Sequence, residues 1–135
     1  MFAIKVEVRD TSARSFSFRH QKTMYGGKRI ARGDTIFLFA SENEGGLGLF
    51  ACGIVTSATP TPRKPNVARQ TPRASVTVKS IALTKRRLGR TELRQFRTWD
   101  DGRPETELNF KLYRQATNKI VGISNETAAF LRGLL

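Results

Sequence analysis

Apolar residues are densest between positions 33 and 55, in two short runs that flank a polar break. The first run covers residues 36–40, the second covers residues 49–55, and the break contains Gly45 and Gly46. β-Branched and aromatic side chains around a glycine pair favour two antiparallel strands over a helical hairpin. Because apolar residues follow one another within each run, both faces of both strands should be covered. This predicts central strands of a sheet or barrel.

Shorter segments before and after this hairpin alternate between apolar and polar positions. Residues 2–8 alternate throughout, which predicts a strand with one buried and one exposed face. The same alternation recurs in four other segments, which we predict as 15–19 (an edge strand or an extended loop), 75–83, 108–113 and 119–123.

Two helices are expected towards the end of the chain. Thr91 can cap a short helix that reaches residue 96, with Glu92 in its first turn. Ser124 can cap a second helix over residues 125–134, whose apolar residues fall on one stripe.

Two segments show neither periodicity and are predicted as loops. Residues 19–29 are polar and contain glycines and an aromatic residue, which is typical of a binding loop. Residues 57–73 contain four prolines and several cations, which predicts an exposed basic loop.

Many short strands with two peripheral helices indicate an α+β fold over residues 1–135 as one domain. We expect a small β-barrel or a strongly curved, mostly antiparallel sheet with two or more peripheral helices.

The charge of the chain indicates which class of molecule it binds. The net charge is +13, from 24 lysines and arginines against 11 acidic residues, which predicts attraction to nucleic acid. Residues 63–103 carry twelve basic residues against three acidic ones, or +9. A solvated surface that only keeps the protein soluble is the alternative. We predict phosphate contacts by Lys28, Arg29, Arg63, Lys64, Lys85, Arg86, Arg87, Arg90 and Arg114.

Other classes of chemistry find little support in the sequence. One histidine, His20, and one cysteine, Cys52, cannot supply a usual zinc site, and no acidic cluster has calcium-loop spacing, so we expect no metal and no cofactor. A lone cysteine permits no intramolecular disulfide, and we see no signal peptide or apolar run long enough for a membrane span. We therefore expect a cytoplasmic protein without membrane partners.

A polar turn and three aromatic residues are the candidates for contacts with a base. Ser41, Glu42 and Asn43 follow the first buried strand and offer donors and acceptors suited to a base edge. Three aromatic rings could stack on a base, or could instead pack in the core: Tyr25, Trp99 and Tyr113. A polar run follows the last of them and could line a pocket mouth or contact phosphates: Arg114, Gln115, Thr117 and Asn118.

The order of these motifs resembles the PUA-like superfamily, and within it the EVE group with its ASCH and YTH relatives. The resemblance rests on Gly33-Asp34 before an apolar strand, on the strand ending Gly53-Ile54-Val55, and on the closing residues 110–124. It implies a small β-barrel with helices packed around it. Members of this superfamily bind RNA or flip a modified base into a pocket, and several read methylated bases.

The resemblance also implies where the pocket lies. The loop that ends at residues 25–27 and the strand end at 41–43 would border it, with Trp99 as a wall. The candidate base pocket is therefore Tyr25, Gly26, Ser41, Glu42, Asn43, Trp99 and Tyr113.

The leading hypothesis is a non-catalytic domain that binds RNA or modified DNA and discriminates a base in this pocket. An ASCH-like nuclease or hydrolase is the alternative, in which Glu42, Lys28 and Arg114 support metal-free cleavage. A third hypothesis is a module that binds an acidic protein through the same basic surface.

Overall fold

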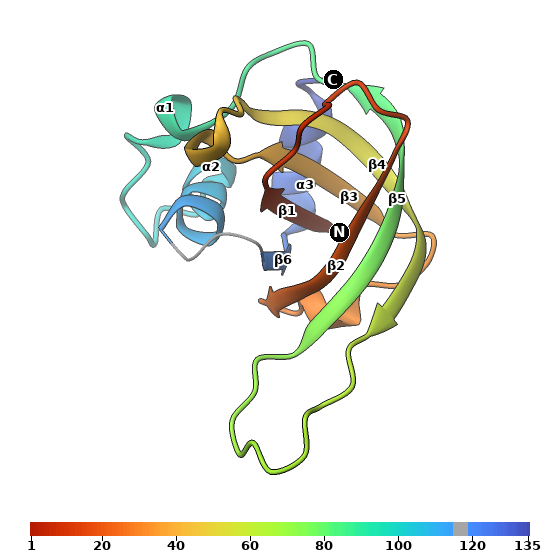
Figure 1. The fold of residues 1–135 in the computed structure, drawn as a ribbon. Coiled ribbons are helices and arrows are strands. Elements are labelled where there is room, and N and C mark those ends of the chain that lie inside the picture. Colours follow the sequence, from red (N-terminus) through yellow and green to blue (C-terminus); the bar gives the residue numbers. More distant parts are fainter. Residues whose placement is uncertain (115–118) are drawn as a thin grey trace.

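Six strands close into a barrel in the computed structural model, which describes residues 1–114 and 119–135 (Figure 1). They are β1 (Phe2–Val6), β2 (Ser15–Met24), β3 (Thr35–Ala40), β4 (Gly48–Pro60), β5 (Arg73–Leu83) and β6 (Lys119–Gly122). Around the barrel the order is β1-β3-β4-β5-β2-β6, and β6 pairs with β1. Four neighbouring pairs are antiparallel, whereas β1–β3 and β2–β6 are parallel. The predicted α+β barrel is confirmed.

Short helical segments surround the barrel. They are the 3₁₀ turns η1 (Gly27–Arg29) and η2 (Glu42–Glu44), the helices α1 (Arg90–Leu93) and α2 (Pro104–Leu108), the π-helical segment η3 (Asn109–Tyr113) and the helix α3 (Asn125–Arg132). In Figure 1, α1 and α2 lie together beside the barrel, and the chain between β4 and β5 projects far beyond it.

The predicted central hairpin is confirmed, and its side chains explain the continuous apolar runs. β3 and β4 are antiparallel, with Ile36 opposite Gly53 and Leu38 opposite Ala51. Alternate residues of β3 belong to different cores. Ile36 and Leu38 point into the barrel, while Phe37 and Phe39 pack outside it against the helices. Both faces are buried because one faces the barrel interior and the other lies beneath the helical layer.

The first strand differs from its predicted half-exposed form. Ile4 and Val6 lie inside the barrel as expected, but Ala3 packs in the outer core and Lys5 is only 3% exposed. β1 lies between β3 and β6, and the helical layer covers the face that the alternation assigned to solvent.

The segment predicted as a polar loop over residues 19–29 is wrong in its first half. Residues 19–24 belong to β2, which is no edge strand because it pairs with both β5 and β6. The register shifts between Phe18 and Gln21, and His20 adopts a left-handed backbone with φ of 53°. Such a bulge shifts the two-residue period, which is why the sequence shows no alternation here.

Two other boundaries change in the structure. β4 continues to Pro60, so the segment between β4 and β5 covers residues 61–72 rather than 57–73. The predicted strand over residues 108–113 is wrong, because these residues form the end of α2 and all of η3. Leu108 and Leu112 are both buried, and their spacing of four suits a helix as well as alternation. Pro104 in the first turn is the start signal that favours the helix.

The two predicted helices are present with shorter bounds. The N-cap of α1 is Gly89, two residues before the predicted cap Thr91, and the Gly89 N–H donates to Glu92 Oε1 at 2.7 Å. The predicted cap of α3 is confirmed: Ser124 Oγ accepts from the Thr127 N–H at 3.2 Å. Within the described residues, no helix is long and apolar enough to cross a membrane.

Candidate nucleic-acid interface

Two exposed aromatic side chains border a cleft beside α2. Trp99 is 77% exposed and Tyr25 is 48% exposed. They line a cleft of about 360 Å³ together with Arg103, Phe110 and Lys111. We call this the aromatic cleft. The flat faces of exposed aromatic rings suit stacking on a base.

A second cleft of about 530 Å³ adjoins the aromatic cleft. It is lined by Tyr25, Gly26, Arg29 and Lys111 together with the first residues of the chain. We call it the terminal cleft. Tyr25 and Lys111 line both clefts, so the tyrosine forms part of the boundary between them.

The backbone of Tyr25 is held in an unusual conformation at this boundary. Tyr25 has φ of 53° and Gly26 has φ of 81°, both in the left-handed region. A Cβ on Gly122 would lie 2.3 Å from the Tyr25 carbonyl oxygen, so only glycine allows β6 to approach this closely. Lys111 Nζ lies 4.7 Å from the centre of the Tyr25 ring and supports its face.

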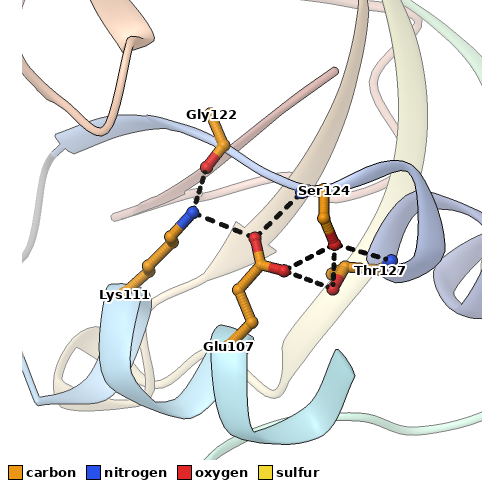
Figure 2. A network of polar contacts seen from close by, with 5 residues as sticks. All are labelled: Glu107, Lys111, Gly122, Ser124 and Thr127. Carbon is orange, nitrogen blue, oxygen red and sulfur yellow. Dashed lines mark hydrogen bonds and ion pairs between the residues drawn. The ribbon is translucent and has the colours of Figure 1, made fainter. Parts of the chain in front are cut away.

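A polar network fixes the wall of both clefts to the barrel (Figure 2). Lys111 Nζ donates to Glu107 Oε2 at 2.9 Å and to the Gly122 carbonyl at 2.7 Å. The hydroxyls of Ser124 and Thr127 each donate to Glu107 Oε1 at 2.7 Å, and the Ser124 N–H donates to Oε2 at 2.9 Å. The Glu107 carboxylate therefore joins α2 and η3 to the start of α3, and Lys111 joins η3 to β6.

The network also sets the ionisation of Glu107. Burial by itself raises the pKa of this carboxyl, but the hydrogen bonds from Ser124, Thr127 and Lys111 outweigh it. The pKa is therefore held below its ordinary value, and the carboxylate stays charged at neutral pH. Its oxygens are already occupied, so we expect it to repel a nearby phosphate less than a free carboxylate would.

The remaining predicted pocket residues form a different cluster. Tyr113 Oη donates to Glu42 Oε2 at 3.1 Å, and the Arg90 N–H donates to the same oxygen at 2.6 Å. Arg90 Nη2 donates to Asn43 Oδ1 at 2.8 Å, and Ser41 is buried at the start of η2. Burial and the Glu42 carboxylate both raise the pKa of Tyr113 far above its ordinary value. The structure thus brings Tyr25, Gly26 and Trp99 to the two clefts, and Ser41, Glu42, Asn43 and Tyr113 to this cluster.

Sequence reasoning missed Lys5, which lies in the same cluster. Its Nζ is 4.2 Å from the centre of the Tyr113 ring, and among the described residues it donates no hydrogen bond. Burial lowers the pKa of Lys5, and the neighbouring Glu42 carboxylate opposes this effect. The signal available in the sequence was a lysine between apolar residues of a predicted strand. The prediction of a half-buried strand placed this lysine on the solvent-facing side.

Replacing Lys5 by methionine is expected to raise the free energy of unfolding by about 1 kcal/mol at pH 7, because burial disfavours the charged ammonium. The folded protein disfavours the charged form, so the advantage of the variant should shrink as the pH rises towards the ordinary lysine pKa of about 10.4. Urea denaturation measures both effects. The control is Lys79→Met, which changes a lysine at an exposed position of β5. A less stable Lys5→Met variant would show that the Tyr113 and Glu42 contacts outweigh desolvation.

The predicted phosphate-binding cations divide between two regions. Lys28 lies on η1, and Arg63 and Lys64 lie in the segment after β4. Lys85, Arg86 and Arg87 lie beyond the other end of β5, whose eleven residues span roughly 30 Å. The basic run over residues 63–103 therefore does not make one surface.

The other predicted contacts are placed as follows. Arg29 lines the terminal cleft, and Arg90 contacts Glu42 and Asn43. Arg87 pairs with Glu92 at 3.8 Å, and the Arg114 guanidinium lies 5.3 Å from the centre of the Phe110 ring. Gln115, Thr117 and Asn118 lie outside the described residues.

The residues of the cleavage alternative lie in three environments. Lys28 lines a cleft beside residues 61–72, Glu42 contacts Tyr113 and Arg90, and Arg114 packs on Phe110. Across residues 1–114 and 119–135, no three histidine, cysteine or acidic side chains are grouped as a metal site would need.

The fold is similar to that of several solved structures. Human THYN1 in complex with DNA containing 5-methylcytosine matches with a TM-score of 0.68 and 17% identity, covering 98% of this chain and 95% of that one. The DUF55 domain of human thymocyte nuclear protein 1 matches with a TM-score of 0.63 and 14% identity, covering 98% and 96%. A Pseudomonas putida protein matches with a TM-score of 0.63 and 15% identity, covering 98% and 97%.

These likenesses confirm the PUA-like barrel predicted from the sequence as the fold. No protein-family model and no curated protein sequence matches the chain.

Proposed function

We propose that this protein binds nucleic acid and holds one base in the aromatic cleft, without performing chemistry on it. The observation that carries the proposal is the pair of exposed rings, Tyr25 and Trp99, on one cleft with Arg103 beside them. Stacking on an aromatic ring is worth about 1–3 kcal/mol per base and tolerates any base. A neighbouring arginine can supply a phosphate contact.

The fold supports the same proposal. A protein of this fold, human THYN1, has been crystallised with DNA that contains 5-methylcytosine. A methyl group on a base adds apolar surface, and the Phe110 ring in the aromatic cleft offers an apolar wall for it. We therefore propose a methylated base in a single-stranded or flipped state as the preferred ligand, in RNA or DNA.

Trp99 provides a direct test because it is the only tryptophan in the chain. Titration with short single strands, with and without methylated cytosine or adenine, should quench its fluorescence and give tighter binding for one methylated form. Anisotropy of a labelled strand, measured at two salt concentrations, should show weaker binding at higher salt. Binding that leaves the fluorescence of Trp99 unchanged would contradict the aromatic cleft as the base site. A denaturing gel of the same samples should show intact strands, whereas shortened strands would favour the nuclease alternative.

A further inference from the structure

The segment between β4 and β5 forms one wall of a third cleft, of about 610 Å³. The opposite wall contains Lys22 at the end of β2 and Lys28 on η1. In Figure 1 this segment extends away from the barrel, at the end of β5 opposite to the C-terminus of the chain. We call the space the hairpin cleft.

The hairpin cleft is lined by cations and by apolar side chains. Five basic residues line it: Lys22, Lys28, Arg63, Lys64 and Arg73. None of the described residues that line it is acidic. Pro62, Pro72 and Val67 supply apolar walls between these cations. A positively charged groove with apolar surfaces matches the chemistry of a single nucleic-acid strand, whose phosphates and unstacked bases need both.

Hydrogen bonds brace the segment that forms the cleft. Gln70 Oε1 accepts from the Lys64 N–H at 2.8 Å, and Gln70 Nε2 donates to the carbonyls of Lys64 and Val67 at 2.7 and 3.0 Å. At its base, the Thr61 N–H donates to the Arg73 carbonyl at 2.9 Å, and Arg73 Nη1 donates to the His20 carbonyl at 2.8 Å. The cations are thus presented on a braced turn.

The turn η1 connects the hairpin cleft with the proposed base site. Lys28 lines the hairpin cleft, and the next residue, Arg29, lines the terminal cleft. A Cβ on Gly27 would clash with the Ile120 carbonyl oxygen, so the backbone of η1 packs directly on β6. Basic side chains therefore follow one another from the hairpin cleft across η1 to Tyr25.

We propose that the hairpin cleft binds the sugar–phosphate backbone of the strand whose base enters the aromatic cleft. The inference rests on the proposed function and extends it: the ligand is a single strand of several nucleotides that crosses η1. Lys28, Arg63 and Lys64 contact phosphates, and Pro62 and Val67 pack against an unstacked base.

The test uses the full chain, a length series of single-stranded oligonucleotides and two charge-matched variants. Arg63→Gln/Lys64→Gln removes two cations from the hairpin cleft. Arg9→Gln/Arg14→Gln removes two exposed cations between β1 and β2, neither of which lines any of the three clefts. The wild type should bind more tightly as the strand lengthens, until the strand spans both clefts. The hairpin variant should bind the longest strand about tenfold more weakly and the shortest strand unchanged. Its salt slope should fall by about 1.4 for two lost single-strand phosphate contacts.

The control variant should bind every length as the wild type does, and Lys28→Gln, on the opposite wall, should reproduce part of the hairpin effect. Equal binding of the longest strand by wild type and hairpin variant would overturn the inference. If the length dependence is present but Trp99 is not quenched, the base site fails and the hairpin site stands. If no strand binds at all, both fail. All altered side chains are exposed, and thermal melts should coincide with the wild type.

Discussion

Replacing Glu107 by alanine is expected to lower the free energy of unfolding by about 3 kcal/mol. The carboxylate receives hydrogen bonds from Lys111, Ser124 and Thr127, and these groups are partly buried with it. Its removal leaves the Lys111 ammonium with the Gly122 carbonyl as its remaining hydrogen-bond acceptor among the described residues. Loss of one partner from such a cluster costs several kcal/mol because the other groups stay desolvated. Urea denaturation followed by circular dichroism measures the change.

The control for this variant is Glu105→Ala, on the same helix α2, which should lower the free energy of unfolding by less than about 1 kcal/mol.

The pH dependence of the stability difference gives a second check. Because the pKa of Glu107 is lowered in the folded state, its contribution is complete above the unfolded pKa of about 4.3 and is lost as the pH falls through the folded value. The difference between wild type and Glu107→Ala should therefore be largest near neutral pH and shrink below about pH 4. A difference that is small or independent of pH would contradict the role assigned to the network.

Replacing Trp99 by alanine is expected to weaken binding of a short single strand roughly tenfold to a hundredfold, without lowering stability. The estimate follows from about 1–3 kcal/mol for stacking of one base on an aromatic ring. Trp99 is 77% exposed, so the fold should not depend on it. Fluorescence anisotropy of a labelled strand measures the affinity, and a thermal melt measures the stability.

Two further variants make this prediction specific. Trp99→Phe keeps a flat ring and should retain most of the affinity. Leu47→Ala removes another exposed apolar side chain, 61% exposed beside η2, and should bind as the wild type does. Equal loss in Trp99→Ala and Leu47→Ala would indicate a general surface effect. Unchanged affinity in Trp99→Ala would remove Trp99 from the base site.

Local patterns were sufficient for the elements whose partners lie nearby in the chain. The hairpin of β3 and β4 follows from two apolar runs around a glycine-containing turn, and the start of α3 follows from Ser124. The same approach failed over residues 108–113, where Leu108 and Leu112 satisfy both a strand and a helix. It also failed within β2, because the bulge near His20 interrupts the alternation that it relied on.

The candidate site was predictable only in part. The sequence named Tyr25 and Trp99 as rings that could stack on a base or pack in the core, and it predicted phosphate contacts by Lys28, Arg63 and Lys64. It did not separate these residues from Glu42 and Tyr113, because spacing along the chain does not show which loops share one end of a barrel. The sequence also suggested one basic surface over residues 63–103. In the structure the cations before β5 and those after it lie at opposite ends of this eleven-residue strand.

The sequence by itself determined the α+β class, the basic character and the absence of an intramolecular disulfide, since composition and short-range periodicity are properties of the chain. Only the tertiary structure decided that Tyr25 and Trp99 line one cleft and that Lys5 is buried beneath Tyr113. It also decided that Lys111, paired with Glu107, ties the helical layer to β6. Each of these depends on contacts between residues far apart in the chain. Closure of the barrel and packing of the helices on its outer face create them.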